Sequence, residues 1–131
     1  MAKYVYPAIF TPEGGGYSIH FPDFESCYTS AVTLTEGLEM ANDVLCLTLY
    51  GLEEDSGKIP QASRVKDIQV TGDEFVSLVA CDTIEYRKFY DNRAVKKTLT
   101  IPAWLNTLAE RQGINFSMTL QAALKQELNI S

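Results

Sequence analysis

The stretch that decides the fold is Val-Lys-Lys-Thr-Leu-Thr-Ile-Pro, residues 95–102, followed by two helical patterns that Gly113 separates. A strand over 96–101 would alternate, because successive strand side chains point to opposite faces. One face is polar and carries Lys96, Thr98 and Thr100. The other face is mostly apolar and carries Lys97, Leu99 and Ile101. Pro102 ends the strand and suits the first turn of a helix, where its missing N–H is no loss.

Two short amphipathic helices are predicted after this strand. The first would bury one stripe, which consists of Trp104, Leu105, Leu108 and Ala109. Gly113 suits the left-handed conformation that closes a helix, and Asn115 is a favourable N-cap for the next one. The second helix would bury Met118 or Leu120, Ala123 or Leu124, and Leu128. A lone strand lacks a partner for its backbone hydrogen bonds, so the sequence predicts two copies that pair antiparallel across a two-fold axis.

This order of strand, proline, helix, glycine and helix resembles the ribbon-helix-helix DNA-binding module, whose paired strands enter the major groove. The resemblance implies that Lys96, Thr98 and Thr100 face bases, because Lys can donate to guanine and Thr can contact a base edge or a thymine methyl. It also implies a DNA phosphate at the start of the second helix, held by Asn115, Phe116 and Ser117 through free backbone N–H groups. The alternative is a ribbon that only dimerises and never touches DNA.

The charge of the chain divides near residue 93. Residues 1–93 carry seven Lys and Arg against fifteen Asp and Glu, a net charge of −8, whereas residues 94–131 carry four against two, a net of +2, which together give −6. With 131 residues and 46% hydrophobic content, the chain can form one medium domain or two small ones with a packed core. An acidic front half should repel phosphate and attract a basic protein.

Neither a metal site nor a cofactor is expected. The three cysteines, Cys27, Cys46 and Cys81, are widely spaced and form no C-x-x-C pair, and His20 is the only histidine. The cysteines are expected to be small buried side chains in a reduced cytosol. No apolar run approaches ~18 residues and the N-terminus lacks a signal-peptide core, so we expect a cytoplasmic protein without a membrane partner.

The front half is predicted to be a small α+β domain with the element order β-β-β-α-β. Strands are expected over 3–10, where Pro7 would mark an edge or a bulge, over 17–21 and over 27–31. Residues 11–16 are rich in glycine and proline and are expected to form a turn. Within the second strand, one face would carry Tyr17, Ile19 and Phe21.

A long helix is predicted after the third strand. Thr33 and Glu36 form a capping box, in which the hydroxyl and the carboxylate each satisfy a free backbone N–H. The helix would end near residues 55–57, and its apolar stripe consists of Leu34, Leu38, Ala41, Leu45, Leu49 and Leu52. Residues 58–64 are expected to form a loop, and residues 74–81 a strand covered on both faces. Residues 82–94 are expected to form either a helical turn or a linker.

Three segments of the front half, 6–10, 15–24 and 33–41, read YPAIF, GGYSIHFPDF and TLTEGLEMA. Together with the tail, they resemble the HicB antitoxin family over essentially the whole chain. The resemblance implies a partly degraded ribonuclease-H-like domain that binds and masks HicA, a small mRNA-cleaving ribonuclease toxin. It also implies a C-terminal domain that represses the toxin-antitoxin operon as a dimer or a higher oligomer. The expected division is a toxin-binding domain, a linker and a ribbon-helix-helix domain, over 1–82, 83–94 and 95–131.

The toxin contact is expected to include an exposed loop after the second strand, which consists of Pro22, Asp23, Phe24 and Glu25. The alternative is that this loop is a simple connection between strands.

No catalytic site is predicted. A ribonuclease-H-type site needs clustered carboxylates that begin on the first strand, and the strand expected over 3–10 has no Asp or Glu. His20 has no evident nucleophile partner. Two other interpretations remain open. One is a metal-dependent nuclease that kept its ancestral fold, which the carboxylate-free strand disfavours. The other is a stand-alone ribbon-helix-helix regulator whose front half senses a small ligand.

Overall fold

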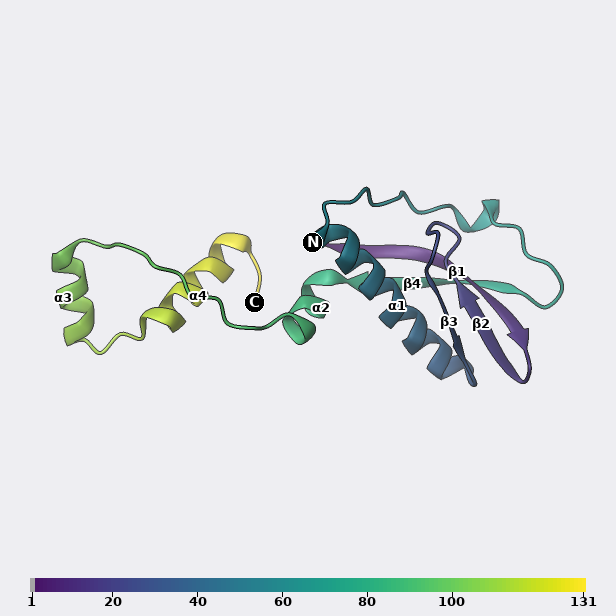
Figure 1. The fold of residues 1–131 in the computed structure, drawn as a ribbon, viewed down its shortest axis with the longest axis horizontal. Helices are drawn as coiled ribbons and strands as arrows, with labels where there is room; N and C mark the ends of the chain where they lie inside the picture. The colour runs from purple at the N-terminus through teal and green to yellow at the C-terminus, as the bar shows by residue number, and fades with distance from the viewer. Residues whose placement is uncertain (1) are drawn as a thin grey trace. The chain divides into compact units, whose positions relative to one another are not determined.

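The computed structural model describes residues 2–131 and divides into two compact units, of which the first ends at Arg93 and the second comprises Ala94–Ser131 (Figure 1). Because the two units are separate bodies, each is described by itself.

The first unit is built on a four-stranded antiparallel sheet with the strand order β3-β2-β1-β4. Its strands are β1 (Lys3–Glu13), β2 (Gly16–His20), β3 (Tyr28–Ala31) and β4 (Phe75–Asp82). The helix α1 (Leu34–Glu54) lies across the sheet (Figure 1). This arrangement confirms the predicted α+β class and the element order β-β-β-α-β.

The first hairpin is tighter than the sequence prediction. Strand β1 continues to Glu13, which pairs with Gly16, so residues 11–13 belong to the strand and not to a turn. Only Gly14 and Gly15 form the connection, with φ values of 57° and 82°. Two successive positive φ angles match the right-handed twist of a two-residue hairpin, which is why two glycines suffice there. The first strand therefore does contain one acidic residue, Glu13, at its end.

Although β1 is an inner strand of the sheet, Pro7 lies in a part of it that is paired on one side only, which fits the predicted edge position. It pairs with Leu78 of β4, whereas the pairing of β1 with β2 begins only at Ile9. The proline is tolerated because this part of β1 has a single paired neighbour, so a missing N–H need not interrupt a ladder on both sides. Strand β4 is less covered than predicted, since Leu78 is 58% exposed.

Helix α1 begins as predicted, because the Thr33 hydroxyl accepts a hydrogen bond from the backbone N–H of Glu36 at 3.1 Å. Its buried residues are Gly37, Ala41, Leu45, Cys46 and Leu49. Leu34 and Leu38 of the predicted stripe are 45% and 42% exposed. The helix instead approaches the sheet at Gly37, where a Cβ would lie 3.2 Å from both Phe10 and Ile19. The first turns of the helix thus contact the sheet through Gly37, and not through Leu34 and Leu38.

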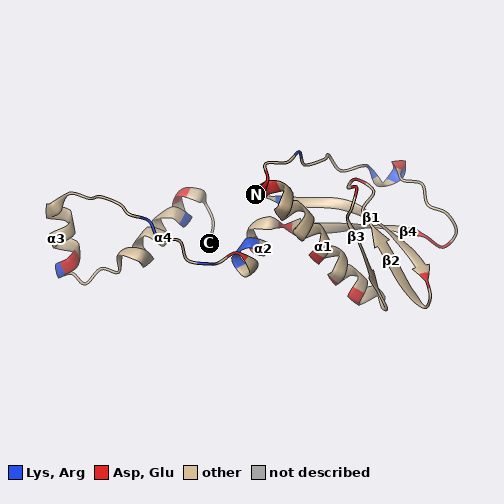
Figure 2. Ribbon diagram, in the orientation of Figure 1, with Lys and Arg blue, Asp and Glu red and all other residues tan. Residues whose placement is uncertain are grey.

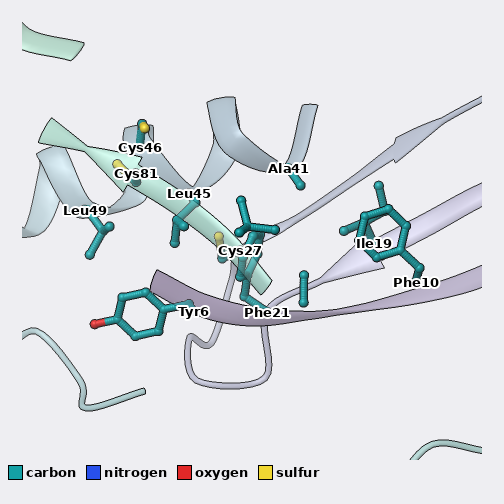
Figure 3. Close-up of a cluster of buried hydrophobic side chains, with 12 residues drawn as sticks. Tyr6, Phe10, Ile19, Phe21, Cys27, Ala41, Leu45, Cys46, Leu49 and Cys81 are labelled. Atoms are coloured by element: carbon teal, nitrogen blue, oxygen red, sulfur yellow. The ribbon is translucent and has the colours of Figure 1, made fainter. Parts of the chain in front are cut away.

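The core of the first unit lies between α1 and the sheet (Figure 3). Alternate residues of β1 and β4 contribute to it, as the period of a strand requires. Its largest fully buried side chains include Phe10, Phe21, Ile19, Leu45 and Leu49. All three cysteines are buried and free, with Cys27 beside Thr48 and with Cys46 and Cys81 facing each other across α1 and β4. They are core residues, as the sequence predicts.

Residues 83–90 form a helix, α2 (Thr83–Tyr90), where the domain division placed the start of a linker. The Asp82 carboxylate caps it by accepting from the N–H groups of Ile84 and Glu85. The helix packs on α1, so the first unit extends to Arg93. Residues 58–64 carry no helix or strand, as predicted, and are followed by a short 3-10 helix at Val65–Asp67.

The second unit contains the two predicted helices, α3 (Ala103–Arg111) and α4 (Phe116–Leu128). Gly113 separates them with a φ of 69°, and the Asn115 side chain accepts from the N–H of Met118 at 3.0 Å as an N-cap. Residues 94–102, all of them described, are neither helical nor paired in a strand. A strand is defined by its ladder, so the predicted ribbon of two chains stays a prediction.

Candidate functional site

The second unit has no core of its own. None of residues 94–131, all of which the structure describes, is buried. Instead it holds an apolar groove of about 610 Å³. We call this the tail groove, and it is lined by Lys97, Leu99, Ile101, Leu105, Asn106, Ala109, Ile114, Phe116, Ser117, Thr119, Leu120 and Ala123. A surface of this kind on a 38-residue unit marks a site for another apolar surface.

The tail groove follows the predicted alternation of residues 96–101. Lys97, Leu99 and Ile101 line it, whereas Lys96, Thr98 and Thr100 do not and are exposed. The helical stripe is only partly as predicted. Leu105 and Ala109 line the groove, but Trp104 and Leu108 do not and are 66% and 54% exposed.

The start of α4 brings together the three residues predicted to hold a phosphate. Asn115 is the N-cap, and Phe116 and Ser117 are the first two residues of the helix. The Asn115 carboxamide already uses the N–H of Met118, which leaves the N–H groups of the first turn as candidate donors. The Phe116 and Ser117 side chains line the tail groove.

In the first unit, the loop predicted to touch a toxin is partly engaged inside the molecule. The Asp23 carboxylate accepts from the backbone N–H of Ser63 at 3.0 Å and from the Ser63 hydroxyl. The ring of Phe24 packs against that of Tyr6 with centroids 4.8 Å apart. Only Pro22 and Glu25 of the four residues are exposed. Asp23 and Phe24 thus fasten the loop and residues near 60 to the sheet.

A buried ionic network joins α1, α2 and the start of β1. Glu53 accepts from the Tyr4 hydroxyl at 2.8 Å, from the Thr83 hydroxyl at 2.9 Å and from the Arg87 guanidinium at 3.1 Å. The side chains of Glu53 and Arg87 are only 5% and 14% exposed. Burial alone would raise the pKa of Glu53, but the hydrogen bonds outweigh it and lower the pKa to about 2.

The same network constrains its partners. Burial and the hydrogen bond to Glu53 raise the pKa of Tyr4 to about 12. Arg87 also contacts Glu54 and lies over the ring of Tyr50, 4.6 Å from its centroid. These contacts hold α2 on α1 and form a structural joint.

Helices α1 and α2 enclose a second groove with β3. It has a volume of about 320 Å³, and we call it the α1–α2 groove; it is lined by Thr29, Met40, Asp43, Val44, Leu47, Tyr86 and Tyr90. Charge is distributed unevenly around it. Residues 4–57 contain no Lys or Arg but nine acidic residues, namely Glu13, Asp23, Glu25, Glu36, Glu39, Asp43, Glu53, Glu54 and Asp55. Figure 2 accordingly shows red bands and no blue on α1.

Sequence reasoning missed the α1–α2 groove. Met40, Asp43 and Leu47 recur at helical spacing on α1, which is a second stripe beside the leucine stripe that the prediction followed. Its partners Tyr86 and Tyr90 lie in the segment for which a helix and a linker remained alternatives. A helical reading of 83–90 would place both tyrosines on one face.

Between residues 2 and 131, no three His, Cys, Asp or Glu side chains are grouped so that they could hold a metal ion. In the same range, no helix is long and apolar enough to cross a membrane.

Residues 6–123 match the family described as the HicB-like antitoxin of bacterial toxin-antitoxin systems. The chain therefore belongs to this family of antitoxins. Antitoxin HicB 1 of Photorhabdus laumondii subsp. laumondii is 34% identical over 92 residues, which are 67% of this chain and 56% of that protein. This chain thus spans little more than half the length of that relative.

Solved structures share the fold. A chain of a toxin-antitoxin complex from Streptococcus pneumoniae is 33% identical with a TM-score of 0.60, covering 95% of this chain and 99% of that one. The antitoxin HicB of Burkholderia pseudomallei is 15% identical with a TM-score of 0.55, covering 95% and 98%. The mixed α+β fold, with its antiparallel sheet and helices, is common to these structures.

Proposed function

We propose that this chain neutralises a small HicA-type ribonuclease toxin through its first unit and represses its own operon through its second unit as a dimer. Membership of the antitoxin family supports the first part. The net charge of −8 over residues 1–93 also supports it, because an acidic surface favours association with a basic protein.

The observation that carries the second part is the tail groove. The groove is apolar, and it lies in a unit that buries none of its residues. Of residues 97–101, only those on one strand face line it. A second copy of the tail would supply both the missing strand ladder and the missing cover. The opposite face, with Lys96, Thr98 and Thr100, would then be free to enter a major groove as a ribbon.

The first unit is proposed to act by binding and not by catalysis, on a partly degraded ribonuclease-H-like sheet. The one carboxylate residue of strand β1, Glu13, lies at the end of the strand beside the hairpin turn. Glu53, the most strongly perturbed carboxylate, is engaged by Tyr4, Thr83 and Arg87. Neither is placed as part of a two-cation site.

The chain cut after Arg93 is expected to be folded, monomeric and still able to neutralise the toxin. The first unit has a hydrophobic core of its own, whereas the proposed dimer contacts lie in the second unit. Sedimentation and inhibition of RNA cleavage would measure both properties. A fragment of residues 1–82 is the matched control and should be less stable, since it lacks α2 and Arg87. A tight dimer of residues 1–93, or loss of neutralisation, contradicts the division of labour.

Operator recognition should separate base contacts from phosphate contacts. Thr98→Ala and Lys96→Ala are each expected to reduce the binding free energy for the operator by on the order of 1–3 kcal/mol. The binding free energy for random DNA should fall much less. Ser117→Ala should weaken both DNAs alike, because a phosphate contact positions the protein without reading sequence. Binding titrations on an inverted repeat from its own promoter and on a scrambled duplex would measure this.

Equal losses on both DNAs for Thr98→Ala would reduce the ribbon to a non-specific anchor. No loss on either DNA would leave it a dimerisation device. A regulator that senses a small ligand would instead bind its operator in a ligand-dependent way and fail to inhibit any toxin.

A further inference from the structure

The lining of the α1–α2 groove includes exposed apolar side chains, since Leu47 is 57% exposed and Tyr90 65%. Phe89 does not line the groove, but it is 75% exposed and its ring lies next to that of Tyr90. The rings form a continuous row, with 4.6 Å between the centroids of Tyr86 and Tyr90 and 4.8 Å between those of Phe89 and Tyr90. Aromatic side chains that stand in solvent beside a groove are the type that dominates protein interfaces.

The charge on the α1 side of this surface is of one sign, and on α2 the exposed Lys88 is paired with Glu85 at 2.9 Å. Glu36, Glu39 and Asp43 follow each other at spacings of three and four on α1 and are all exposed. That spacing puts them on the helix face that also carries Leu47. Residues 4–57 provide no Lys or Arg to neutralise them (Figure 2). The surface therefore repels nucleic acid and complements a partner rich in Lys and Arg.

Strand β3 adds an unpaired edge to the same surface. It is the outermost strand of the sheet beside β2, and its Thr29 lines the groove. An open edge of this kind offers backbone donors and acceptors to a neighbouring chain. Apolar anchors, an acidic border and a strand edge thus meet in one place.

We propose that the α1–α2 groove is the docking surface for the toxin, a small basic protein that inserts apolar side chains flanked by Lys or Arg. This inference rests on the proposed antitoxin function and names the surface that performs it. The loop at residues 22–25 would then contribute less to toxin binding than this groove. Its Asp23 and Phe24 are engaged internally, and the exposed Glu25 leads directly toward β3.

The test compares two leucines of nearly equal exposure in the full chain. Leu47 in the groove is 57% exposed, and Leu78 on the opposite face of the sheet is 58% exposed. Leu47→Arg is expected to weaken binding of a purified HicA-type toxin by about 30-fold or more, the size of an interface hot spot. Leu78→Arg should leave the affinity within about twofold. Calorimetric titration with purified toxin measures both affinities. Because both positions are exposed, each variant should stay folded, which circular dichroism would check.

A second pair isolates the charge. Asp43→Lys reverses a charge in the groove, and Asp73→Lys reverses one in the exposed turn before β4. Asp43→Lys should slow toxin association on the order of tenfold at low salt, with the difference shrinking as salt rises, because steering is screened. Asp73→Lys should have a smaller effect that reflects net charge alone.

The outcomes separate the inference from the function it rests on. A wild-type chain that does not bind the toxin overturns the proposed function. A wild-type chain that binds, with Leu47→Arg binding equally well, overturns the docking surface and leaves the function standing. If Leu47→Arg instead lowers the mass of the free protein in sedimentation, the groove is a contact between copies of this chain, and the inference is wrong.

Discussion

Replacing Glu53 by Gln is expected to lower the free energy of unfolding of the first unit by on the order of 3 kcal/mol. The substitution removes the charge that faces Arg87, whose side chain is only 14% exposed. A buried guanidinium that loses the more buried of its two glutamate partners keeps the cost of leaving water. Urea unfolding followed by far-ultraviolet circular dichroism would measure the change. Trp104 fluorescence would follow the second unit separately.

Glu54→Gln is the matched control, because Glu54 also contacts Arg87 but its side chain is 44% exposed. An exposed ion pair contributes little, so this variant should lose less than about 1 kcal/mol. Equal losses of stability for the two variants would show that burial is not the reason for the contribution of Glu53 to the free energy of unfolding.

The pH dependence of the Glu53 effect has a definite sign. The pKa of Glu53 is about 2 in the folded chain, against an ordinary value of 4.5. A lowered pKa stabilises the fold fully above about pH 4.5, and the contribution is lost as the pH falls toward 2. The difference in unfolding free energy between wild type and Glu53→Gln should therefore be constant near neutrality and shrink over that acidic window. A difference that grows on acidification contradicts the network.

Leu99→Glu is expected to abolish dimerisation and to weaken operator binding by about 100-fold or more. Leu99 is 63% exposed in one chain but lines the tail groove, so the proposed dimer would bury it. A carboxylate buried there without a partner costs several kcal/mol. Sedimentation and an operator titration would measure the two effects.

Lys96→Glu reverses a charge three residues away on the face that does not line the groove. It should reduce operator binding while the protein stays a dimer. If both variants remain dimeric, the tail groove is not the dimer interface.

The fold was largely predictable where one local rule decides an element. The Thr33 cap, the break at Gly113 and the Asn115 cap each depend on a few neighbouring residues, and all three appear in the structure. The alternation of residues 96–101 was predictable for the same reason.

Features set by distant contacts were not predictable. The exposure of Leu34 and Leu38 depends on how closely Gly37 lets α1 approach Phe10 and Ile19. The helix at 83–90 depends on the ionic joint between Arg87 and Glu53, which are 34 positions apart. The internal use of Asp23 depends on Ser63, which is 40 positions away. Hydrophobic pattern alone contains none of these pairings.

If the tail represses as proposed, a unit without a buried residue would make repression second order in the concentration of the protein. In the proposed dimer, the tail acquires its core only when two chains meet, so the concentration of the DNA-binding form rises with the square of the chain concentration while most chains are single. The proposed toxin binding by the first unit would need only one chain and would have no such threshold. A falling supply of the protein would therefore release its promoter before it releases the toxin.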